Sequence, residues 1–522
     1  MTVANRSGLP IARPTFVSAG AATTSTDDVA ERHVVFQAIL QMLLVVAIGI
    51  GASLMAHSGL GTPARLLFFA GGLGAAGYYV RRSPWLYLTV CFWFWTLAPC
   101  FRRVVDYYAG FDPTSIMLAT PSFMTLFTLN AVLNSSSLLA RRSGRIGLLL
   151  AVPICYGLFV NFVLGDVLPG AVAAADWLVP LLYYFYFLTL SDRIAEAEEH
   201  FRIFLTLNLA FIVIYGLNQY FAPTDWDIAW IRDSGLVELG GPLPFTVRLF
   251  STLNMPGPLA IWVSTVLLLA LHFRTKLMLL VLPAAGILLL LTLVRSVLGT
   301  TAVGLIAAIL FGRPKVFVSV VKSVTLLTLV MGGIGAIVLV TDPDLSDRIE
   351  ARFGTLNRLD YDVSAEARRA TYAAAPGELD DHPFGTGIAT LGRGAVVAGR
   401  GQVVIDAGPV AIYLALGWIG GTTYLIGIIL VTLQTISGAR ASGSPAALAL
   451  AAATIANLSM LAFDNAMGVQ AAILWTCAGY ANAMADGFRE PIDENAAYDV
   501  PALGETEFLS AAGPDSSQGI AR

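Results

Sequence analysis

Apolar runs of about 20 residues recur along most of the chain, and short polar turns separate them. A helix of that length spans a hydrocarbon core of about 30 Å. The pattern predicts an all-α fold, a polytopic integral membrane helical bundle of about 12–14 transmembrane helices. A transmembrane β-barrel is excluded, because barrel strands alternate in polarity. The expected crossings are 34–56, 64–80, 84–101, 115–138, 146–165, 171–190, 201–221, 252–272, 276–293, 296–312, 316–340, 408–433, 446–463 and 466–485.

Composition narrows the functional class. The chain has 522 residues, of which 56% are hydrophobic and 13% charged, against roughly 25% charged residues in soluble domains. The net charge is −4 and no dense Lys/Arg block occurs, so no nucleic-acid partner is expected. The four cysteines fall inside or beside apolar runs, without a CxxC pair. They indicate buried thiols, and neither a metal nor a cofactor is expected.

Positive charge predicts the orientation of the bundle. Alternate short loops carry most of the Lys and Arg, as at Arg81–Arg82, Arg141–Arg142 and Arg440. Such loops are typically cytoplasmic, so both termini are expected inside. Arg102 and Arg103 fall in the opposite set of loops and run against this rule.

Loop length divides the chain into five parts, and the longest hydrophilic loop is expected outside the cytoplasm. Its roughly sixty residues are too few for an independent domain, so it is interpreted as a cap over a cavity among the helices. The parts are a cytoplasmic polar N-terminal tail (1–33), a transmembrane bundle (34–340) with a periplasmic loop near 222–250, a large periplasmic loop (341–405), C-terminal transmembrane helices (406–486) and a disordered cytoplasmic tail (487–522).

Two arginines near the outer side are candidates for binding an anion. Arg295 interrupts an otherwise uncharged run from Leu277 to Phe311, and an arginine in hydrocarbon is expected to face a wet cavity or an anion. The alternative is that it marks a turn between two crossings. Arg248 precedes an irregular helix opening, where free N–H groups and a neighbouring arginine suit an anion. Interfacial snorkelling is the alternative for Arg248.

A further pair of arginines lies in the large loop. Arg368 and Arg369 belong to "SAEARRATYAAA", which is interpreted as a helix, and a surface pair of Arg369 with Glu366 is an alternative role. Arginine matches phosphate in a bidentate geometry. Arginines from several outer segments therefore suit a pyrophosphate-linked lipid better than an ion channel, which needs a ring of like groups.

Two residues are candidates for a general base. His382 is the only histidine of the large loop, in "DDHPFGTGIATLG", a glycine motif without the GK[ST] ending of a phosphate-binding P-loop. A structural role is the alternative for His382. Asp406 opens the next membrane helix. It caps that helix, or it is a partly desolvated carboxylate that accepts a proton.

The order of four motifs resembles the O-antigen ligase and polymerase superfamily of bacterial membrane glycosyltransferases, in particular the Wzy-type polysaccharide polymerases. The motifs are "RLFSTLNMPGPLA", "LTLVRSVLGT", "HPFGTGIATLG" after a long loop, and "DAGPVAIYLALGWIGG". The resemblance covers roughly residues 245 to 435. It implies a helical membrane bundle with a large periplasmic loop, in the bacterial inner membrane, with the active site facing the periplasm.

The resemblance also implies a reaction. Its donor is a glycan on undecaprenyl pyrophosphate, without metal or nucleotide sugar, and single displacement inverts the anomeric carbon. Arg248 and Arg295 are implied to hold the pyrophosphate, with Arg368 or Arg369 as the loop arginine.

Ligases of this superfamily carry a histidine where this chain has Asp406, so the resemblance favours a polymerase of repeat units for exopolysaccharide, capsule or O-antigen. Asp406 is the expected base and His382 the second choice. The lipid bilayer and a chain-length co-polymerase are the expected partners. An O-antigen ligase acting on lipid A core is the alternative function, and a polysaccharide transporter a weaker one.

Overall fold

The computed structural model describes residues 24–312, 363–400 and 407–487, together with the single positions 318, 322, 333 and 405. Within these residues the regular structure is helical, apart from one isolated bridge between Gly240 and Val247. Helices satisfy their own backbone hydrogen bonds, which a lipid environment requires.

The helices follow the apolar runs of the sequence. They are α1 (Thr24–His57), α2 (Gly61–Tyr79), α3 (Pro84–Ala109), η1 (Ile116–Leu118), α4 (Thr120–Thr125), η2 (Leu126–Thr128), α5 (Leu129–Asn134), α6 (Ser137–Ala140), α7 (Arg142–Val163), α8 (Val167–Thr189), η3 (Ser191–Glu196), α9 (Ala197–Phe221), α10 (Asp225–Asp233), η4 (Val237–Leu239), α11 (Pro256–Leu269), α12 (Lys276–Leu291), α13 (Arg295–Phe311), α16 (Val363–Asp381), η7 (Ile388–Thr390), α17 (Gly392–Val397), α18 (Gly408–Ser442), α19 (Pro445–Ser459), η8 (Met460–Ala462) and α20 (Gly468–Gly487).

The predicted fold class is confirmed: the protein is an all-α, multi-pass membrane bundle. In the described part of the chain, eight helices are long and apolar enough to cross a membrane, and α11, α12 and α13 are shorter apolar helices. Every predicted crossing coincides with helical structure, except 316–340, which lies outside the described residues. The crossing at 115–138 is broken into short pieces.

Helical structure also occurs in segments that were expected to be a tail or loops. α1 begins at Thr24, inside the expected polar tail. The loop near 222–250 contains α10 and η4, and the described part of the large loop contains α16, η7 and α17.

Aromatic side chains of α3, α8 and α20 fill the centre of the bundle. Trp93, Tyr183, Phe187 and Trp475 are fully buried. The Phe187 and Tyr480 rings stack with centroids 5.2 Å apart. Aromatic pairs of this kind stabilise by about 1 kcal/mol beyond burial, so these helices form a rigid frame for the loops at their ends.

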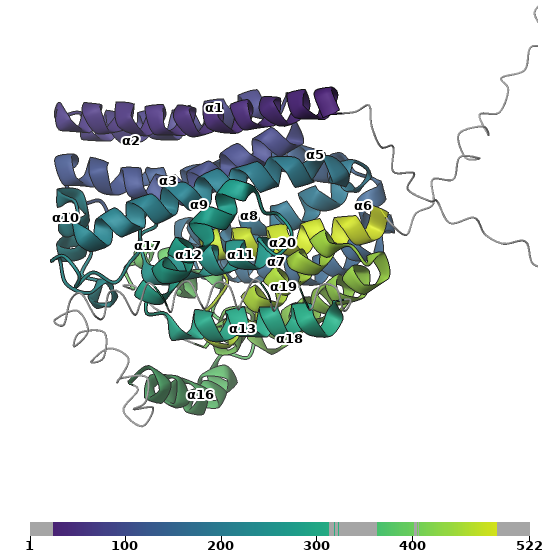
Figure 1. Ribbon diagram of the computed structural model, residues 1–522. Coiled ribbons are helices and arrows are strands. Elements are labelled where there is room, and N and C mark those ends of the chain that lie inside the picture. Colours follow the sequence, from purple (N-terminus) through teal and green to yellow (C-terminus); the bar gives the residue numbers. More distant parts are fainter. Residues whose placement is uncertain are drawn as a thin grey trace, which may run out of the picture.

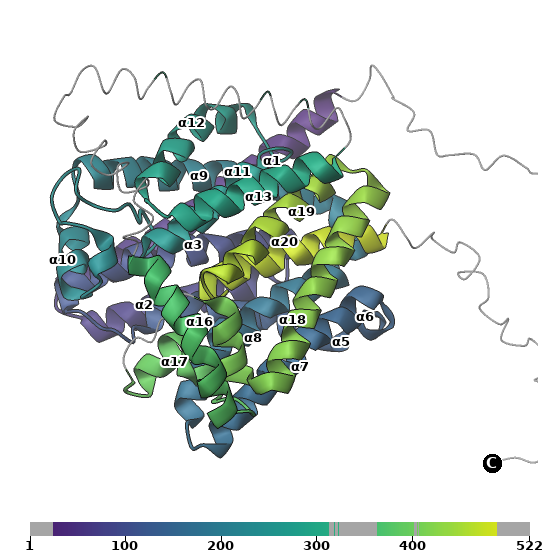
Figure 2. The same ribbon diagram turned by 90° about the horizontal axis from the view of Figure 1, so that it is seen from below.

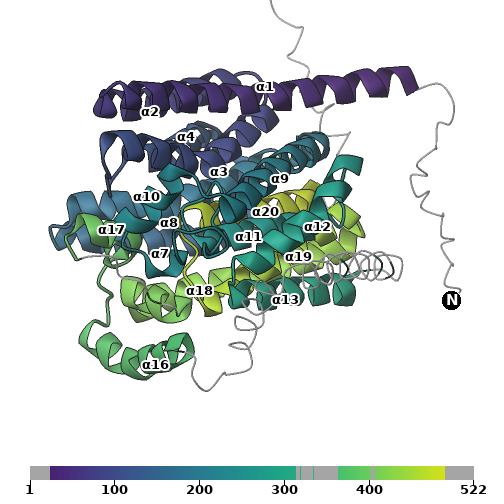
Figure 3. The ribbon, with the colours of Figure 1, turned by 60° about the vertical axis from the view of Figure 1, so that its left-hand side comes forward.

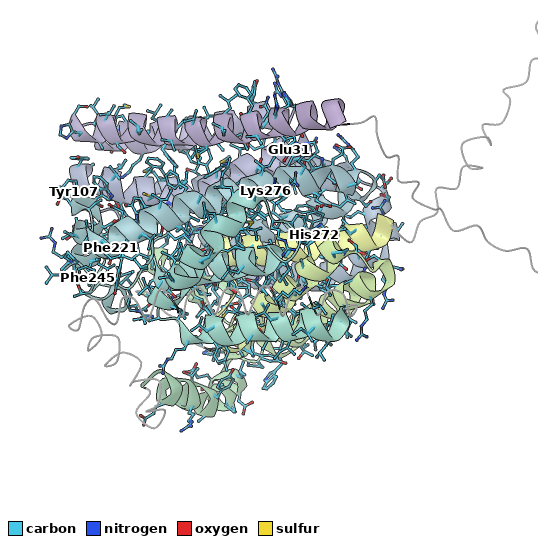
Figure 4. All side chains as sticks on the ribbon, in the orientation of Figure 1. Glu31, Tyr107, Phe221, Phe245, His272 and Lys276 are labelled. Carbon is cyan, nitrogen blue, oxygen red and sulfur yellow. The ribbon has the colours of Figure 1, made fainter. Side chains whose placement is uncertain are left out.

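The bundle has two distinct ends, as Figure 1 shows. We call the end with the start of α1 and the finish of α20 the tail end, and the end with α10 and α17 the loop end. In Figure 4, Tyr107, Phe221 and Phe245 gather at the loop end, whereas Glu31 lies toward the tail end. Figure 3 shows α1 and α2 as one outer layer, with α16 on the opposite side.

The arginine-rich turns lie at the tail end. Arg81 and Arg82 lie between α2 and α3, Arg141 precedes α7, and Arg440 lies in the last turn of α18. These turns and both described termini share one end (Figure 1), which is the arrangement that the distribution of positive charge predicts.

Two sequence motifs interlock through their backbones. α18 is broken at Gly417, whose φ is 70° and ψ −178°. The carbonyls of Leu414 and Ala415 accept hydrogen bonds from the N–H groups of Thr386 (2.8 Å) and Gly387 (3.0 Å). In return, the Trp418 N–H donates to the Pro383 carbonyl at 3.0 Å. The motif "HPFGTG" therefore replaces the helical hydrogen bonds that the break removes.

We expect Gly417→Ala to destabilise the protein by about 2–5 kcal/mol, because a Cβ combines backbone strain with overpacking. That Cβ would lie 2.5 Å from the carbonyl carbon of Phe384 and 2.6 Å from the Pro383 oxygen. Thermal unfolding in detergent measures the effect. Gly74→Ala is the control, because a Cβ there meets nothing within 4 Å. Equal melting temperatures for the two variants would contradict the interlock.

Candidate functional site

A cavity of about 500 Å³ opens among the elements of the loop end. We call it the loop-end cavity. Its walls come from α3, α8, α10 and α17, from the segment before α4, and from the first residues of α11 and α20. Apolar and aromatic side chains make up most of the lining, including Trp95, Phe111 and Trp230. Two arginines, one aspartate and one asparagine supply its charge and most of its polarity: Arg102, Arg393, Asp176 and Asn254.

Arg102 reaches the cavity from α3. Its Nε donates to Asp106 Oδ2 at 2.9 Å, and Nη2 donates to the Asp112 carbonyl at 2.5 Å. The guanidinium also lies 4.7 Å from the Trp230 ring centroid and 5.4 Å from that of Phe111. Cation–π contacts of this kind hold the charge in place without neutralising it. Arg102 is thus a buried, oriented cation on one wall.

Arg393 supplies the second cation, from α17. Its Nε lies 3.1 Å from Asp176 Oδ1 and 3.0 Å from Oδ2, and Nη2 also donates to Oδ1. The Arg393 side chain is 33% exposed and that of Asp176 only 8%. Burial lowers the pKa of Arg393, but the pairing with Asp176 outweighs it and raises the pKa above the usual value for arginine. The guanidinium therefore stays protonated in the cavity wall.

Glycines bring α17 close enough to α8 for this pair to form. A Cβ on Gly394 would lie 3.0 Å from Ala173 Cβ and 3.1 Å from the Pro169 carbonyl, so α17 or α8 would have to shift by a few tenths of an ångström to admit it. Gly392, at φ 61°, makes the turn into α17. Asn161 Oδ1 accepts the Ala389 N–H at 2.9 Å. The glycine motif thus serves close backbone packing, which places Arg393 beside α8.

A buried network supports the cavity from behind. Arg103 and Asp227 pair at 2.9 Å with both side chains wholly buried. Arg103 also donates to the Ser251 carbonyl at 2.5 Å, to the Leu253 carbonyl and to Asn254 Oδ1 at 3.2 Å. The segment 251–254 is therefore fixed to α3, and it carries Asn254 to the cavity just before α11 begins.

The structure brings Arg248 and Arg295 to one turn. The Arg248 guanidinium lies against the carbonyls of Thr292 (3.3 Å) and Leu293 (3.5 Å), beyond the end of α12. Arg295 is the first residue of α13 and is exposed, as the turn interpretation anticipates. Neither residue lines the loop-end cavity.

The remaining candidates lie elsewhere or outside the described residues. Arg369 and His382 are both exposed, within and just after α16, and neither lines the loop-end cavity. α16 packs on α18 through an apolar cluster that includes Leu379 and Leu414. Figure 2 shows α16 beside α18. Asp406 and the side chain of Arg368 lie outside the described residues. The described part of the large loop therefore contributes a cavity wall through α17.

Sequence reasoning named none of the three charged residues that line the cavity as candidates, although two of them carried a signal. Arg102 lies at the end of the bundle where the positive-inside rule disfavours arginine. Its presence there indicates that the side chain has a role at that end. Asp176 is the only charged residue of the predicted crossing 171–190, and such residues are functional candidates by default. Arg393 follows the glycine motif directly, and nothing local distinguishes it from a surface arginine.

The cavity combines two guanidinium groups with broad aromatic surfaces. This suits a ligand with an anionic group and apolar or sugar faces. Among the described residues, no three His, Cys, Asp or Glu side chains lie close enough together to hold a metal ion.

No protein-family model matches the chain, and the curated proteins compared with it include no significant match. The chemistry of the site is therefore argued from its geometry.

Proposed function

We propose that this protein is a membrane glycosyltransferase that polymerises undecaprenyl-pyrophosphate-linked oligosaccharide repeat units into exopolysaccharide, capsule or O-antigen. The observation that carries the proposal is the loop-end cavity, where Arg102 and Arg393 meet from distant parts of the chain. The positive-inside distribution of charge supports a loop end that faces the periplasm, with the protein in the bacterial inner membrane.

The cavity chemistry supports a lipid-linked glycan as ligand. Guanidinium groups bind phosphate oxygens through paired hydrogen bonds. Trp95, Phe111 and Trp230 line the same space and offer rigid apolar faces, against which the C–H faces of sugar rings pack. The polyprenyl chain would extend into the surrounding bilayer. A single lipid-linked glycan would therefore contact the guanidinium groups, the aromatic side chains and the surrounding bilayer.

The proposed reaction is a single displacement. The hydroxyl oxygen of an acceptor sugar attacks the anomeric carbon of the donor, and the C–O bond to pyrophosphate breaks with its electron pair on the departing oxygen. Arginines stabilise the charge that grows there. A general base takes the hydroxyl proton. Asp406 is the expected base from the resemblance and lies outside the described residues.

A polymerase binds two lipid-linked substrates, each with a pyrophosphate. The loop-end cavity is one place for an anion. The turn between α12 and α13, which holds Arg248 and Arg295, is a second. A ligase that transfers glycan to lipid A core needs only one polyprenyl pyrophosphate. Two arginine sites therefore favour a polymerase over a ligase.

Purified protein in proteoliposomes tests the function. We expect lipid-linked repeat units to be converted into a ladder of longer chains, with release of undecaprenyl pyrophosphate, in the absence of an ion gradient. Transfer only to added lipid A core would indicate a ligase. Movement of the lipid-linked glycan across the bilayer without any new glycosidic bond would indicate a transporter, and either result would refute the polymerase.

We expect Arg295→Ala to abolish polymer in a complementation assay while protein abundance stays normal, because a pyrophosphate contact is lost and an exposed side chain carries little packing energy. Polymer length on gels is the readout. Arg232→Ala is the control, since Arg232 is an exposed arginine of α10 at the same end. Wild-type chain lengths from Arg295→Ala would exclude the turn between α12 and α13 as a second pyrophosphate site.

A further inference from the structure

Asp176 is the only acidic side chain that lines the loop-end cavity among the described residues, and no histidine, lysine, cysteine or tyrosine lines it. In the part of the cavity wall that the structure describes, no other side chain can receive a hydroxyl proton at neutral pH. We propose that Asp176 is the general base that takes the acceptor proton. This inference rests on the proposed glycosyl transfer and assigns the proton transfer to Asp176 in place of Asp406, the base that the resemblance implies.

The position of Asp176 is costly for a purely structural group. It is the tenth residue of α8, about 14 Å along the helix from its loop-end start. Charges at such depth cost several kcal/mol unless they are paired. An apolar pair of similar volume is often as stable as a buried ion pair. The pair with Arg393 thus keeps a carboxylate at this depth, which stability alone does not require.

A second ion pair already joins the same two parts of the chain. Arg400, just after α17, pairs with Asp166, just before α8, at 2.5 Å. These side chains are more exposed, at 44% and 21%, and neither lines the cavity. The outer pair and the close packing of Gly394 on Ala173 hold α17 against α8. The inner pair is therefore available for another role.

The carboxylate of Asp176 is accessible on one side. Arg393 approaches it with Nε and Nη2, and a carboxylate has further lone pairs beyond those that one arginine uses. Gly468 lines the cavity next to it, and a Cβ there would lie 3.6 Å from Oδ1. Because Gly468 has no side chain, this flank of the carboxylate is left uncovered for a hydroxyl group.

In the proposed step, proton transfer to Asp176 accompanies the departure of the pyrophosphate. As the acceptor oxygen bonds to the anomeric carbon, its proton moves to an Asp176 oxygen. The bond between the anomeric carbon and the pyrophosphate oxygen breaks, and its electron pair leaves with that oxygen. Arg102 and Arg393 are the two cations that line the cavity among the described residues, and they can stabilise this charge. The proton then passes from Asp176 to water.

Asp176→Asn tests this role in the proteoliposome assay. We expect turnover to fall by about 10²–10⁴-fold, while binding of undecaprenyl pyrophosphate stays within about threefold, because Arg393 and Arg102 remain. Asp166→Asn is the matched control and should keep near wild-type turnover. Asp176→Glu retains the charge but moves the carboxylate, so it should fold normally and lose at least tenfold in turnover.

The outcomes separate this inference from the proposed function. Turnover above a third of wild type in either Asp176 variant would overturn the role of Asp176 and leave the glycosyltransferase standing. Parallel loss of lipid binding and melting temperature in both variants would assign Asp176 a structural role, and would also overturn the inference. Absence of any transfer by the wild-type protein, with intact lipid binding, would instead refute the proposed function.

Discussion

Arg393→Ala is expected to lower glycosyl transfer by about 10²–10³-fold, because a preorganised cation that stabilises a leaving group contributes on that order. The variant also leaves Asp176 without its partner in a cavity wall, which adds repulsion toward a pyrophosphate. Turnover of lipid-linked repeat units in proteoliposomes measures the effect, together with polymer length in complemented cells.

Two variants make this result specific. Arg400→Ala removes the neighbouring arginine, which pairs with Asp166 outside the cavity, and should change turnover by less than about threefold. Arg393→Lys keeps the charge but loses the bidentate geometry, so an intermediate rate is expected. Normal turnover in Arg393→Ala would exclude the cavity as the place where the leaving group is stabilised.

Arg103→Ala is expected to destabilise the protein by about 3–5 kcal/mol, since it leaves Asp227 buried and uncompensated. It also frees the carbonyls of Ser251 and Leu253, which Arg103 holds. Thermal unfolding in detergent measures the loss. Joint replacement of Arg103 and Asp227 by apolar residues should cost less than Arg103→Ala alone, because no unpaired charge remains.

Arg193→Ala is the control for that prediction. Arg193 pairs with Glu196 at 2.8 Å, but both side chains are about half exposed, and such pairs contribute about 0–1 kcal/mol. A melting temperature for Arg103→Ala equal to that of Arg193→Ala would show that the buried network does not support the loop end.

Hydropathy predicted the helices because membrane insertion depends on local apolar length. Thus the expected 84–101 and 446–463 segments coincide with α3 and α19. It did not predict the division of 115–138 into η1, α4, η2 and α5. That segment contains no charged residue, and most of its Ser, Thr and Asn residues are scattered among apolar ones, so mean hydropathy cannot register how its backbone is divided.

The charged site was less accessible to sequence reasoning. Arg393 and Asp176 lie 217 residues apart, and they meet because Gly394 lets α17 pack on Ala173. A contact of this kind depends on tertiary packing, which no local pattern encodes. Arg248 and Arg295 lie at the same turn, and their expected role in holding a pyrophosphate stays a prediction.

The central claim is that the arginines of the loop-end cavity bind a polyprenyl pyrophosphate. A cryo-electron microscopy structure of the protein with undecaprenyl pyrophosphate tests it most directly. The claim predicts density for the diphosphate within hydrogen-bond distance of Arg102 and Arg393, with the polyprenyl chain leaving toward the bilayer. Diphosphate density bound away from both guanidinium groups would contradict it.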